Sequence, residues 1–421
     1  MVPDYYSCTM ISISRIALLL IFASLTAFGQ KPGSNPSVLL VSFDGFRHDY
    51  IDKHDLKNFK AFRASGASAE GLIPAYPSLT FANHYAIVTG MYPSNNGLVD
   101  NSFYDSALNA TYTISNRELV ANPSFYGGTP LWTLAKQNGM KTASYFWVGS
   151  EVKDEARRPD KYFVYDVRTS FNTRVDSVIS WLNKKGDERP RLITLYFSEP
   201  DHTAHDTGPN SPETHAMLLK MDSVLGYLMD GVKKVKAPVN TILVSDHGMA
   251  ELKAVDETYV FCDELYDVKS KKVRTVVSSA LAHLYIDDQV TLDSMYTLLK
   301  SKEHNYKVYK RSELPEHLNY GNNYRIGDLV MIAEPQHYIR FNDRKGNTRT
   351  RTGANFGVHG YDPTVVTDMR GIFLAQGPQV KKGLKLGLVR NIDIYPFVAK
   401  ILNLPLPKID GDPKALLPAL R

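Results

Sequence analysis

Residues 37–46 read SVLLVSFDGF and set the architecture that the rest of the chain follows. The first seven residues form an almost continuous apolar run, which ends abruptly at Asp44. Such a run, without alternation of polar and apolar residues, is typical of a strand buried on both faces of a parallel sheet. The carboxyl ends of strands in open α/β sheets face the crevice where ligands bind, so Asp44 is a candidate site residue.

Two later segments repeat this pattern. Residues 192–197 (LITLYF) precede Asp201, and residues 241–245 (TILVS) precede Asp246. Helical stretches lie between them. Residues 211–213 (SPE) predict an N-cap followed by Pro at the first helical position, and apolar residues then recur at helical spacing. We therefore predict an α/β fold with a central, mainly parallel sheet.

The pattern changes between about residues 251 and 355, where strand-like pieces mix with one helix. This stretch predicts an inserted small α+β subdomain, after which the sheet resumes. The expected elements are strands at 282–286 and 329–332, a helix at about 292–301, a late strand at 371–375 and a last helix at 392–402.

Composition fits one large catalytic domain at residues 30–421 rather than a string of small modules. The chain has 421 residues, of which 43% are hydrophobic and 22% charged, and its net charge is +5. Lys and Arg are scattered and form no dense tract, so we expect no stable nucleic-acid partner. A mild positive charge favours anionic small-molecule substrates. Oligomeric state is not predicted.

The N-terminus resembles an export signal. Arg15 precedes an apolar run at residues 16–28, and a polar KPGSNPS stretch follows. This run suits a signal peptide at residues 1–29 and is too short to span a bilayer. We expect an exported protein, periplasmic or secreted, with no membrane span. Removal of the signal would take Cys8 and leave Cys262 alone, hence no internal disulfide.

Histidines accompany the three acidic residues that follow strands. Taken singly, each Asp is explained as a helix cap or turn residue, and each His as a structural group. Their shared position at one edge of the sheet instead indicates metal ligands. Mixed imidazole and carboxylate ligation favours zinc over manganese, iron or cobalt. The candidate ligands are Asp44, Asp201, His205, Asp246, His247 and His359.

Thr80 is the candidate nucleophile. It precedes FANHYAIVTG at residues 81–90, a stretch that predicts a helix entered after Pro74 and Pro77. A helix N-terminus favours negative charge on a hydroxyl or a bound phosphate. Local sequence alone nevertheless favours an ordinary N-cap at this position.

Several motifs in order resemble those of the nucleotide pyrophosphatase/phosphodiesterases of the alkaline phosphatase superfamily. They run from Asp44 to Asp362 and so cover most of the chain after the signal peptide. The resemblance implies a three-layer α/β/α sandwich with an inserted subdomain. The matching stretches are VSFDGFRHDY, PSLTFANHY with VTGMYPSNNGLVDN, WVGSE, SEPDHTAHDTGP, SDHGM and GVHGYDP.

The resemblance also implies two zinc ions and a covalent threonine intermediate. Asn101 would donate to a phosphate oxygen, while Phe81 and Tyr165 would stack a nucleobase. A packed strand aromatic is an equally good explanation of Tyr165. One zinc would be held by Asp44, Thr80, Asp246 and His247, and the other by Asp201, His205 and His359.

Three positions depart from the family pattern. Ala82 replaces a frequent Pro and Ala204 a common Gly, and neither change removes a ligand. His202 fits no ligand position, so we expect an ordinary loop residue there.

The charge around Thr80 favours a diester substrate over a monoester. No Lys or Arg occurs between Arg63 and Arg117, although Arg157 or Arg158 remains available to neutralise an extra charge. The leading hypothesis is a nucleotide phosphodiesterase that releases nucleoside 5'-monophosphates. The alternatives are a phosphodiesterase for lipid or choline phosphodiesters and a non-catalytic, metal-stabilised binding module. A sulfatase is disfavoured, because the Cys/Ser-x-Pro-x-Arg pattern is missing at Thr80.

Overall fold

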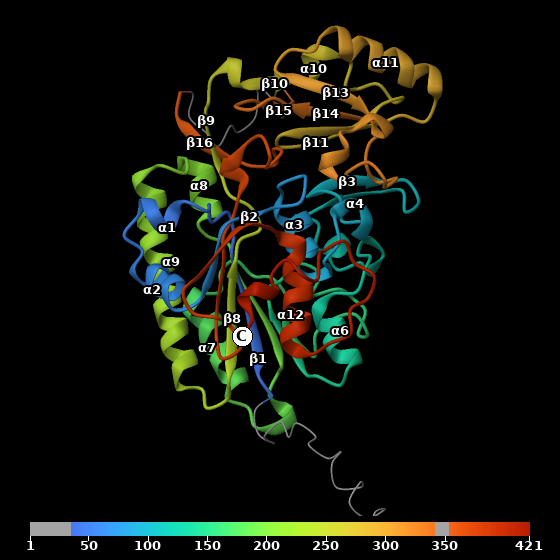
Figure 1. Cartoon of the computed structure of the whole chain (residues 1–421). Helices are drawn as coiled ribbons and strands as arrows, with labels where there is room; N and C mark the ends of the chain where they lie inside the picture. Colours follow the sequence, from blue (N-terminus) through green and yellow to red (C-terminus); the bar gives the residue numbers. More distant parts are fainter. Residues whose placement is uncertain (1–34, 342–352) are drawn as a thin grey trace, which may run out of the picture. The chain divides into compact units, whose positions relative to one another are not determined.

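An eight-stranded sheet runs through the computed structural model, which describes residues 35–341 and 353–421 (Figure 1). The predicted signal peptide at residues 1–29 lies outside the described residues. The strand order is β18-β2-β17-β8-β1-β7-β5-β6. Bounds are β1 Ser37–Phe43, β2 Ala67–Ile73, β5 Thr142–Tyr145, β6 Lys161–Phe163, β7 Leu192–Phe197, β8 Val239–Val244, β17 Phe373–Gln376 and β18 Leu384–Arg390.

The sheet is mostly parallel, as the sequence predicted. β1 lies at its centre and pairs in parallel with both β7 and β8. β5 continues the parallel order beside β7, and β6 beside β5. Only β17 opposes its neighbours in this sheet, because it is antiparallel to both β8 and β2.

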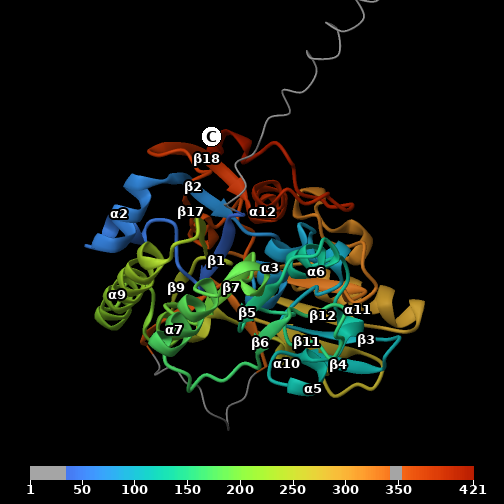
Figure 2. The same cartoon turned by 90° about the horizontal axis from the view of Figure 1, so that it is seen from below.

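Both faces of β1 are buried, which explains its mainly apolar sequence. Val38 and Leu40 pack into one apolar cluster, whereas Leu39 and Val41 pack into another on the opposite face. Helices cover the two faces, so the predicted three-layer arrangement is confirmed (Figure 2). The first cluster includes α3 (Thr80–Thr89), α6 (Leu131–Gln137) and α12 (Ile394–Leu402), and the second α2 (Lys57–Ser65), α7 (Phe171–Leu182) and α9 (Pro212–Lys234).

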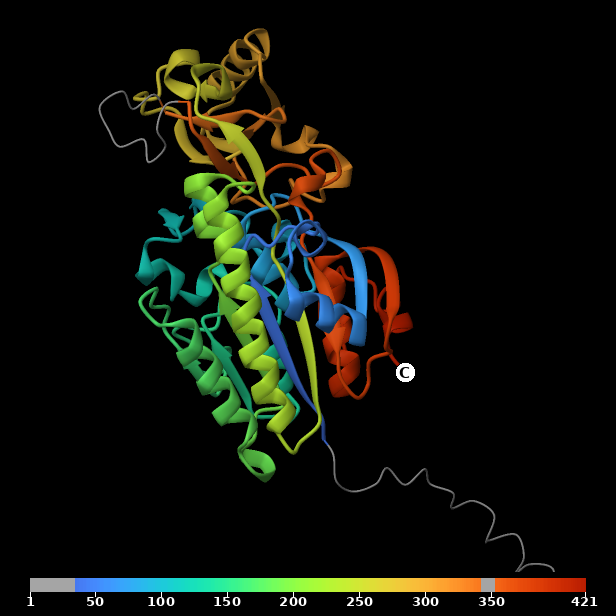
Figure 3. The ribbon, with the colours of Figure 1, turned by 90° about the vertical axis from the view of Figure 1, so that its left-hand side faces the viewer.

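Helix starts follow the predicted capping chemistry in part. The side chain of Ser211 accepts from the backbone of Thr214, and Pro212 opens α9, which Figure 3 shows along one face of the sheet. The helix expected from 392 begins instead at Ile394, because residues 391–393 form a 3₁₀ turn. The other short helices are α1 Tyr50–Lys53, α4 Pro93–Asn96, α5 Arg117–Val120, α8 Asp201–Thr207 and α10 Cys262–Leu265.

A second, antiparallel sheet of four strands occupies the stretch expected to be an inserted subdomain. Its order is β11-β12-β14-β13, and with α11 (Gln289–Ser301) it contributes to a separate apolar cluster. The bounds of a subdomain at about 251–355 stay a prediction. The strands are β11 Arg274–Ser278, β12 Leu281–Tyr285, β13 Tyr306–Lys310 and β14 Leu329–Ala333.

Three short strand pairs complete the fold. They are β3 (Ser102–Asp105) with β4 (Ala110–Thr113), β9 (Ala250–Lys253) with β16 (Asn355–Val358), and β10 (Tyr259–Phe261) with β15 (Tyr338–Arg340). Cys262 is buried and carries a free thiol. Throughout 35–341 and 353–421, every helix is too short or too polar to cross a membrane.

Candidate metal and phosphate site

The candidate ligands gather at the carboxyl edge of the central sheet. Asp44 directly follows β1, Asp201 opens α8 shortly after β7, and Asp246 follows β8. The backbone N–H of Asp201 donates to the carbonyl of Asp44 at 3.1 Å, which ties two of these loops together. Gly45 allows this approach, because a Cβ there would lie 2.8 Å from the Cβ of Asp201, and its φ is +65°.

Thr80 and two of the candidate ligands surround an imidazole nitrogen of a third, His247. Nε2 of His247 lies 3.1 Å from Oδ2 of Asp246 and 3.6 Å from Oδ1 of Asp44. The Oγ1 atom of Thr80 lies 3.2 Å from the same nitrogen. The structure therefore brings together the four residues that the resemblance assigns to one ion.

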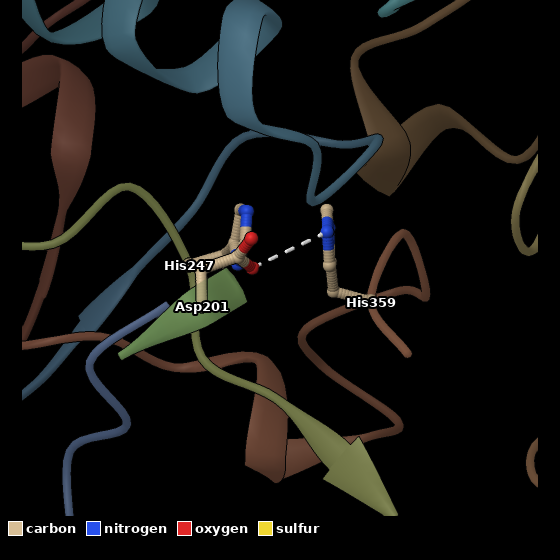
Figure 4. Close-up of side chains that lie close together, drawn as sticks. All are labelled: Asp201, His247 and His359. Carbon is tan, nitrogen blue, oxygen red and sulfur yellow. Dashed lines mark ion pairs between the residues drawn. The ribbon is translucent and has the colours of Figure 1, made fainter. Parts of the chain in front are cut away.

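The other three candidates form an adjoining group. The Nε2 atoms of His205 and His359 are 3.0 Å apart. They lie 3.5 Å and 3.6 Å, respectively, from Oδ1 of Asp201. The ring of His359 also stacks on that of His247, with centroids 3.7 Å apart, so the two groups share a border (Figure 4). Donor atoms of Asp201, His247 and His359 all lie within 4.8 Å of one another, which leaves His247 within reach of either group.

Backbone carbonyls fix the imidazole tautomers. Nδ1 of His205 lies 2.8 Å from the carbonyl oxygen of Gly357, and Nδ1 of His359 lies 2.8 Å from that of Ser78. His247 makes the same contact with the carbonyl of Gly248 at 2.8 Å. A carbonyl only accepts, so each Nδ1 carries a proton, and each Nε2 is the ring atom that faces the cluster. A hydrogen bond from the ring nitrogen that does not bind the metal typically orients a metal-binding histidine.

Three carboxylate oxygens in the cluster lack a hydrogen-bond partner in the part of the chain that the structure describes. They are Oδ1 of Asp44, Oδ1 of Asp201 and Oδ2 of Asp246, and all three are buried. Buried polar atoms are rarely left unpaired, because desolvation is costly without compensation. These oxygens, together with the three imidazole Nε2 atoms, fit a site for metal cations.

The electrostatics of Asp44 and His359 also favour bound cations. Burial raises the pKa of the Asp44 carboxyl well above its usual value, and the charges of Asp246 and Asp201 raise it further. Burial holds the pKa of His359 well below its usual value, and the imidazoles of His247 and His205 add to the effect. Cations among these side chains would offset the carboxylate repulsion and would bind the neutral imidazoles.

Thr80 does not cap its helix. It is the first residue of α3, and the N-cap position is Leu79, which makes no side-chain cap bond. The ordinary N-cap explanation is therefore wrong, and the hydroxyl faces His247 instead. One residue on, the backbone N–H of Phe81 donates to Oδ1 of Asn101 at 2.9 Å. This bond uses the amide oxygen of Asn101 and leaves its NH₂ group as a donor.

The aromatic candidates pack against different apolar clusters. Phe81 packs against the cluster that contains α3, and Tyr165 against the one that contains α7. Tyr165 belongs to the loop between β6 and α7, so the explanation as a strand residue is wrong. Its ring lies 6.2 Å from that of Tyr196, and no ring contact joins it to Phe81 within the described ranges.

Two residues that support the site were not identified from the sequence. The hydroxyl of Tyr196 donates to Oδ2 of Asp44 at 2.6 Å. Nδ1 of His84 lies 2.9 Å from the carbonyl of Thr80 and 3.3 Å from Oδ2 of Asp246. The carbonyl requires a proton on that nitrogen, so His84 supports Asp246 rather than offering a ligand atom there. Its spacing four residues after Thr80, on the same helix face, was the available signal.

The structure also places the other residues that the sequence analysis discussed. Nη2 of Arg157 donates to the carbonyls of Tyr126 at 2.6 Å and Gly128 at 3.0 Å, and Arg158 lies over the ring of Tyr162. His202 is an exposed residue of α8, so the loop prediction for it is wrong. Ala82 and Ala204 are buried inside α3 and α8, respectively.

A sequence model of the family described as type I phosphodiesterase / nucleotide pyrophosphatase matches residues 38–362. The chain belongs to this family. Its arrangement is also similar to the solved structure of an inactive murine ectonucleotide pyrophosphatase / phosphodiesterase 5 in complex with AMP. That structure has a TM-score of 0.84 and 30% identity, over 92% of this chain and 100% of the other.

Curated relatives of the same family are longer proteins. Ectonucleotide pyrophosphatase/phosphodiesterase family member 1 of Homo sapiens is 34% identical over 379 residues, which are 88% of this chain and 40% of that protein. Venom phosphodiesterase of Macrovipera lebetinus is 35% identical over 389 residues, which are 90% of this chain and 44% of the relative. This chain thus spans less than half of the length of these two relatives.

Proposed function

We propose that this protein is a metal-dependent phosphodiesterase that hydrolyses nucleotide phosphodiester or pyrophosphate bonds and releases nucleoside 5'-monophosphates. The observation that carries the proposal is the position of Thr80. Its hydroxyl lies at the start of α3 without capping it, 3.2 Å from Nε2 of His247, in a cluster with three buried carboxylate oxygens that lack a hydrogen-bond partner in the described residues. Membership of the phosphodiesterase family and similarity to a structure in complex with AMP support the choice of a nucleotide.

Two zinc ions would fit the two groups of ligands. When bound, they would supply the positive charge that lowers the pKa of the Thr80 hydroxyl and stabilises charge on the phosphate oxygens. One ion would be held by Asp44, Thr80, Asp246 and His247, and the other by Asp201, His205 and His359.

The residues of the chain account for the other requirements of the reaction. Oγ1 of Thr80 attacks phosphorus, and the bond to the leaving oxygen breaks on the opposite side. The amide NH₂ of Asn101 donates to a non-bridging oxygen, since its carbonyl already accepts from Phe81. Water then attacks the phosphothreonine diester, which releases the nucleoside monophosphate and restores the Thr80 hydroxyl. Two in-line displacements retain the configuration at phosphorus.

Charge favours a diester as the substrate. A monoester brings an additional negative charge, yet the segment from Arg63 to Arg117 contains no intervening Lys or Arg. Arg157 uses its guanidinium on backbone carbonyls. Neutral Asn101 suits the less charged phosphodiester.

The test compares two chromogenic substrates on one sample whose metal content is measured. The nitrophenyl ester of a nucleoside monophosphate should be hydrolysed much faster than nitrophenyl phosphate. Faster hydrolysis of the monoester would contradict the proposal. The rate of hydrolysis of nitrophenyl phosphocholine, measured on the same sample, tests the alternative of choline phosphodiesters. Activity that is lost with a chelator and with Thr80→Ala would exclude a non-catalytic binding module.

Export to the periplasm or the exterior is also a proposal. It follows from the apolar run at residues 16–28 and its polar flank. Fractionation of cells that produce the full chain tests it, with N-terminal sequencing of the product. A product that begins near residue 30 outside the cytoplasm is expected, whereas an unprocessed cytoplasmic chain would contradict the proposal.

A further inference from the structure

A buried polar network joins the antiparallel sheet to the segment of residues 97–101, which ends in Asn101. Asp100 and His283 are both fully buried. Nε2 of His283, in β12, lies 3.2 Å from Oδ2 of Asp100. They are 183 residues apart in sequence. A buried carboxylate is costly unless it is paired, so this contact calls for a reason beyond packing.

The hydrogen bonds assign a direction to the pair. The backbone N–H of Gly327 donates to Nδ1 of His283 at 3.2 Å, so Nδ1 accepts and the ring proton is on Nε2. That proton is donated to Oδ2 of Asp100. Oδ1 of the same carboxylate accepts from the hydroxyl of Ser278, in β11, and from the backbone N–H of Ser102 at 2.9 Å. Asp100 is therefore held by donors on both of its oxygens.

Two other residues of the 97–101 segment accept hydrogen bonds through their backbone carbonyls. The hydroxyl of Tyr320 donates to the carbonyl of Val99 at 3.1 Å. Nη1 of Arg325 donates to the carbonyl of Gly97 at 2.8 Å. Three positions of a five-residue segment thus bond to side chains from residues 278–325.

Asn101 is consequently fixed from two directions. Its backbone follows Asp100, which the antiparallel sheet holds, and its side-chain oxygen accepts from Phe81 at the start of α3. The side chain of Asn101 therefore keeps little freedom to move, and the direction of its NH₂ group depends on contacts outside the central sheet. A misplacement of about 1 Å in a catalytic group can lower a rate by about 100-fold.

We propose that His283 and Ser278 are positioning residues for the hydrolysis, because they clamp Asp100 and thereby place the amide of Asn101 at the phosphate. This inference rests on the proposed function. It gives the antiparallel sheet a positioning role in the reaction, exerted through Asp100.

A double-mutant cycle tests the inference. The turnover of a nitrophenyl nucleoside phosphodiester is measured for the wild type, His283→Phe, Asn101→Ala and the double variant. His283→Phe should lower kcat by about 10-fold or more with little change in KM, since a positioning error acts on the transition state. In the Asn101→Ala background the same substitution should leave kcat almost unchanged.

Ser278→Ala provides a second arm that changes little volume and decides the question if His283→Phe does not fold. Ser37→Ala is the matched control, because its buried hydroxyl donates to the carbonyl of Pro190 at the start of β1, away from the site. Its kcat should equal that of the wild type.

Four outcomes separate the claims. A loss of kcat that depends on Asn101 supports the inference. An equal loss in both Asn101 backgrounds, or none from either substitution, overturns it and leaves the proposed function intact. An Asn101→Ala variant as fast as the wild type also overturns it, because nothing would then need positioning. A wild-type protein that does not hydrolyse the diester overturns the proposed function and the inference together.

Discussion

Replacing Tyr196 with Phe removes a single oxygen atom beside the candidate metal cluster. The hydroxyl of Tyr196 donates to Oδ2 of Asp44 at 2.6 Å, while Oδ1 of Asp44 has no hydrogen-bond partner in the described residues. Burial raises the pKa of Tyr196 well above its usual value, and the charge of Asp44 raises it further, so the hydroxyl stays a donor. Without it, Asp44 loses the contact that orients its free oxygen toward His247.

The size of the effect follows from this bond. A hydrogen bond to a charged acceptor contributes about 1.5–3 kcal/mol, and contacts that support metal ligands are typically worth about 10–100-fold in affinity or activity. We expect Tyr196→Phe to weaken zinc binding by about 10–100-fold. Activity should fall at limiting zinc, and excess zinc should restore much of it.

Competition with a chromogenic chelator measures the affinity, and thermal unfolding of the metal-free protein checks the fold. Tyr306→Phe is the matched control, since that buried hydroxyl donates at 2.8 Å to the carbonyl of Leu299 in another part of the fold. Zinc affinity of Tyr196→Phe equal to that of the wild type would refute the reasoning. So would an equal loss in Tyr306→Phe.

Three further predictions concern other residues. Asn101→Ala should lower kcat for the diester by about 100–1,000-fold with little change in KM, as for other lost donors to a developing oxyanion. An unchanged kcat would remove Asn101 from the reaction. Tyr165→Leu should raise KM for a nucleotide ester by roughly 5–150-fold, the value of stacking one base, and leave that of a small nitrophenyl phosphodiester unchanged. A parallel rise for both substrates would argue against a base-stacking role. Burial raises the pKa of the Cys262 thiol to about 12, which depletes the reactive thiolate at pH 8. In a Cys8→Ser chain, iodoacetamide should therefore label Cys262 in urea and not in the native protein, and rapid native labelling would contradict its burial.

The central sheet was predictable where strands are buried on both faces. β1, β7 and β8 have mainly apolar sequences, and each is followed by a candidate ligand. β18 gives no such signal, because most of its residues are partly or fully exposed and it contains Lys385 and Gly387. Strand order was not predictable, since pairing joins segments that are far apart in the chain.

The candidate site was predictable from motif order more than from any single residue. Thr80 shows why local sequence is insufficient: its position before a helix suggested a cap, and only the position of its hydroxyl beside His247 excludes this. Tyr196 lies in an apolar strand whose packing explains it, so its bond to Asp44 had no sequence signal. The pairing of Asp100 with His283 spans 183 residues and likewise required tertiary structure.

The stereochemical course at phosphorus tests the covalent role of Thr80 most directly. A single stereoisomer of a nitrophenyl nucleoside phosphorothioate is hydrolysed in ¹⁸O-labelled water, and the configuration of the product is determined by ³¹P NMR. Two in-line displacements, the first by Thr80 and the second by water, predict retention. Inversion would show that water attacks the substrate itself, and Thr80 would not be the nucleophile.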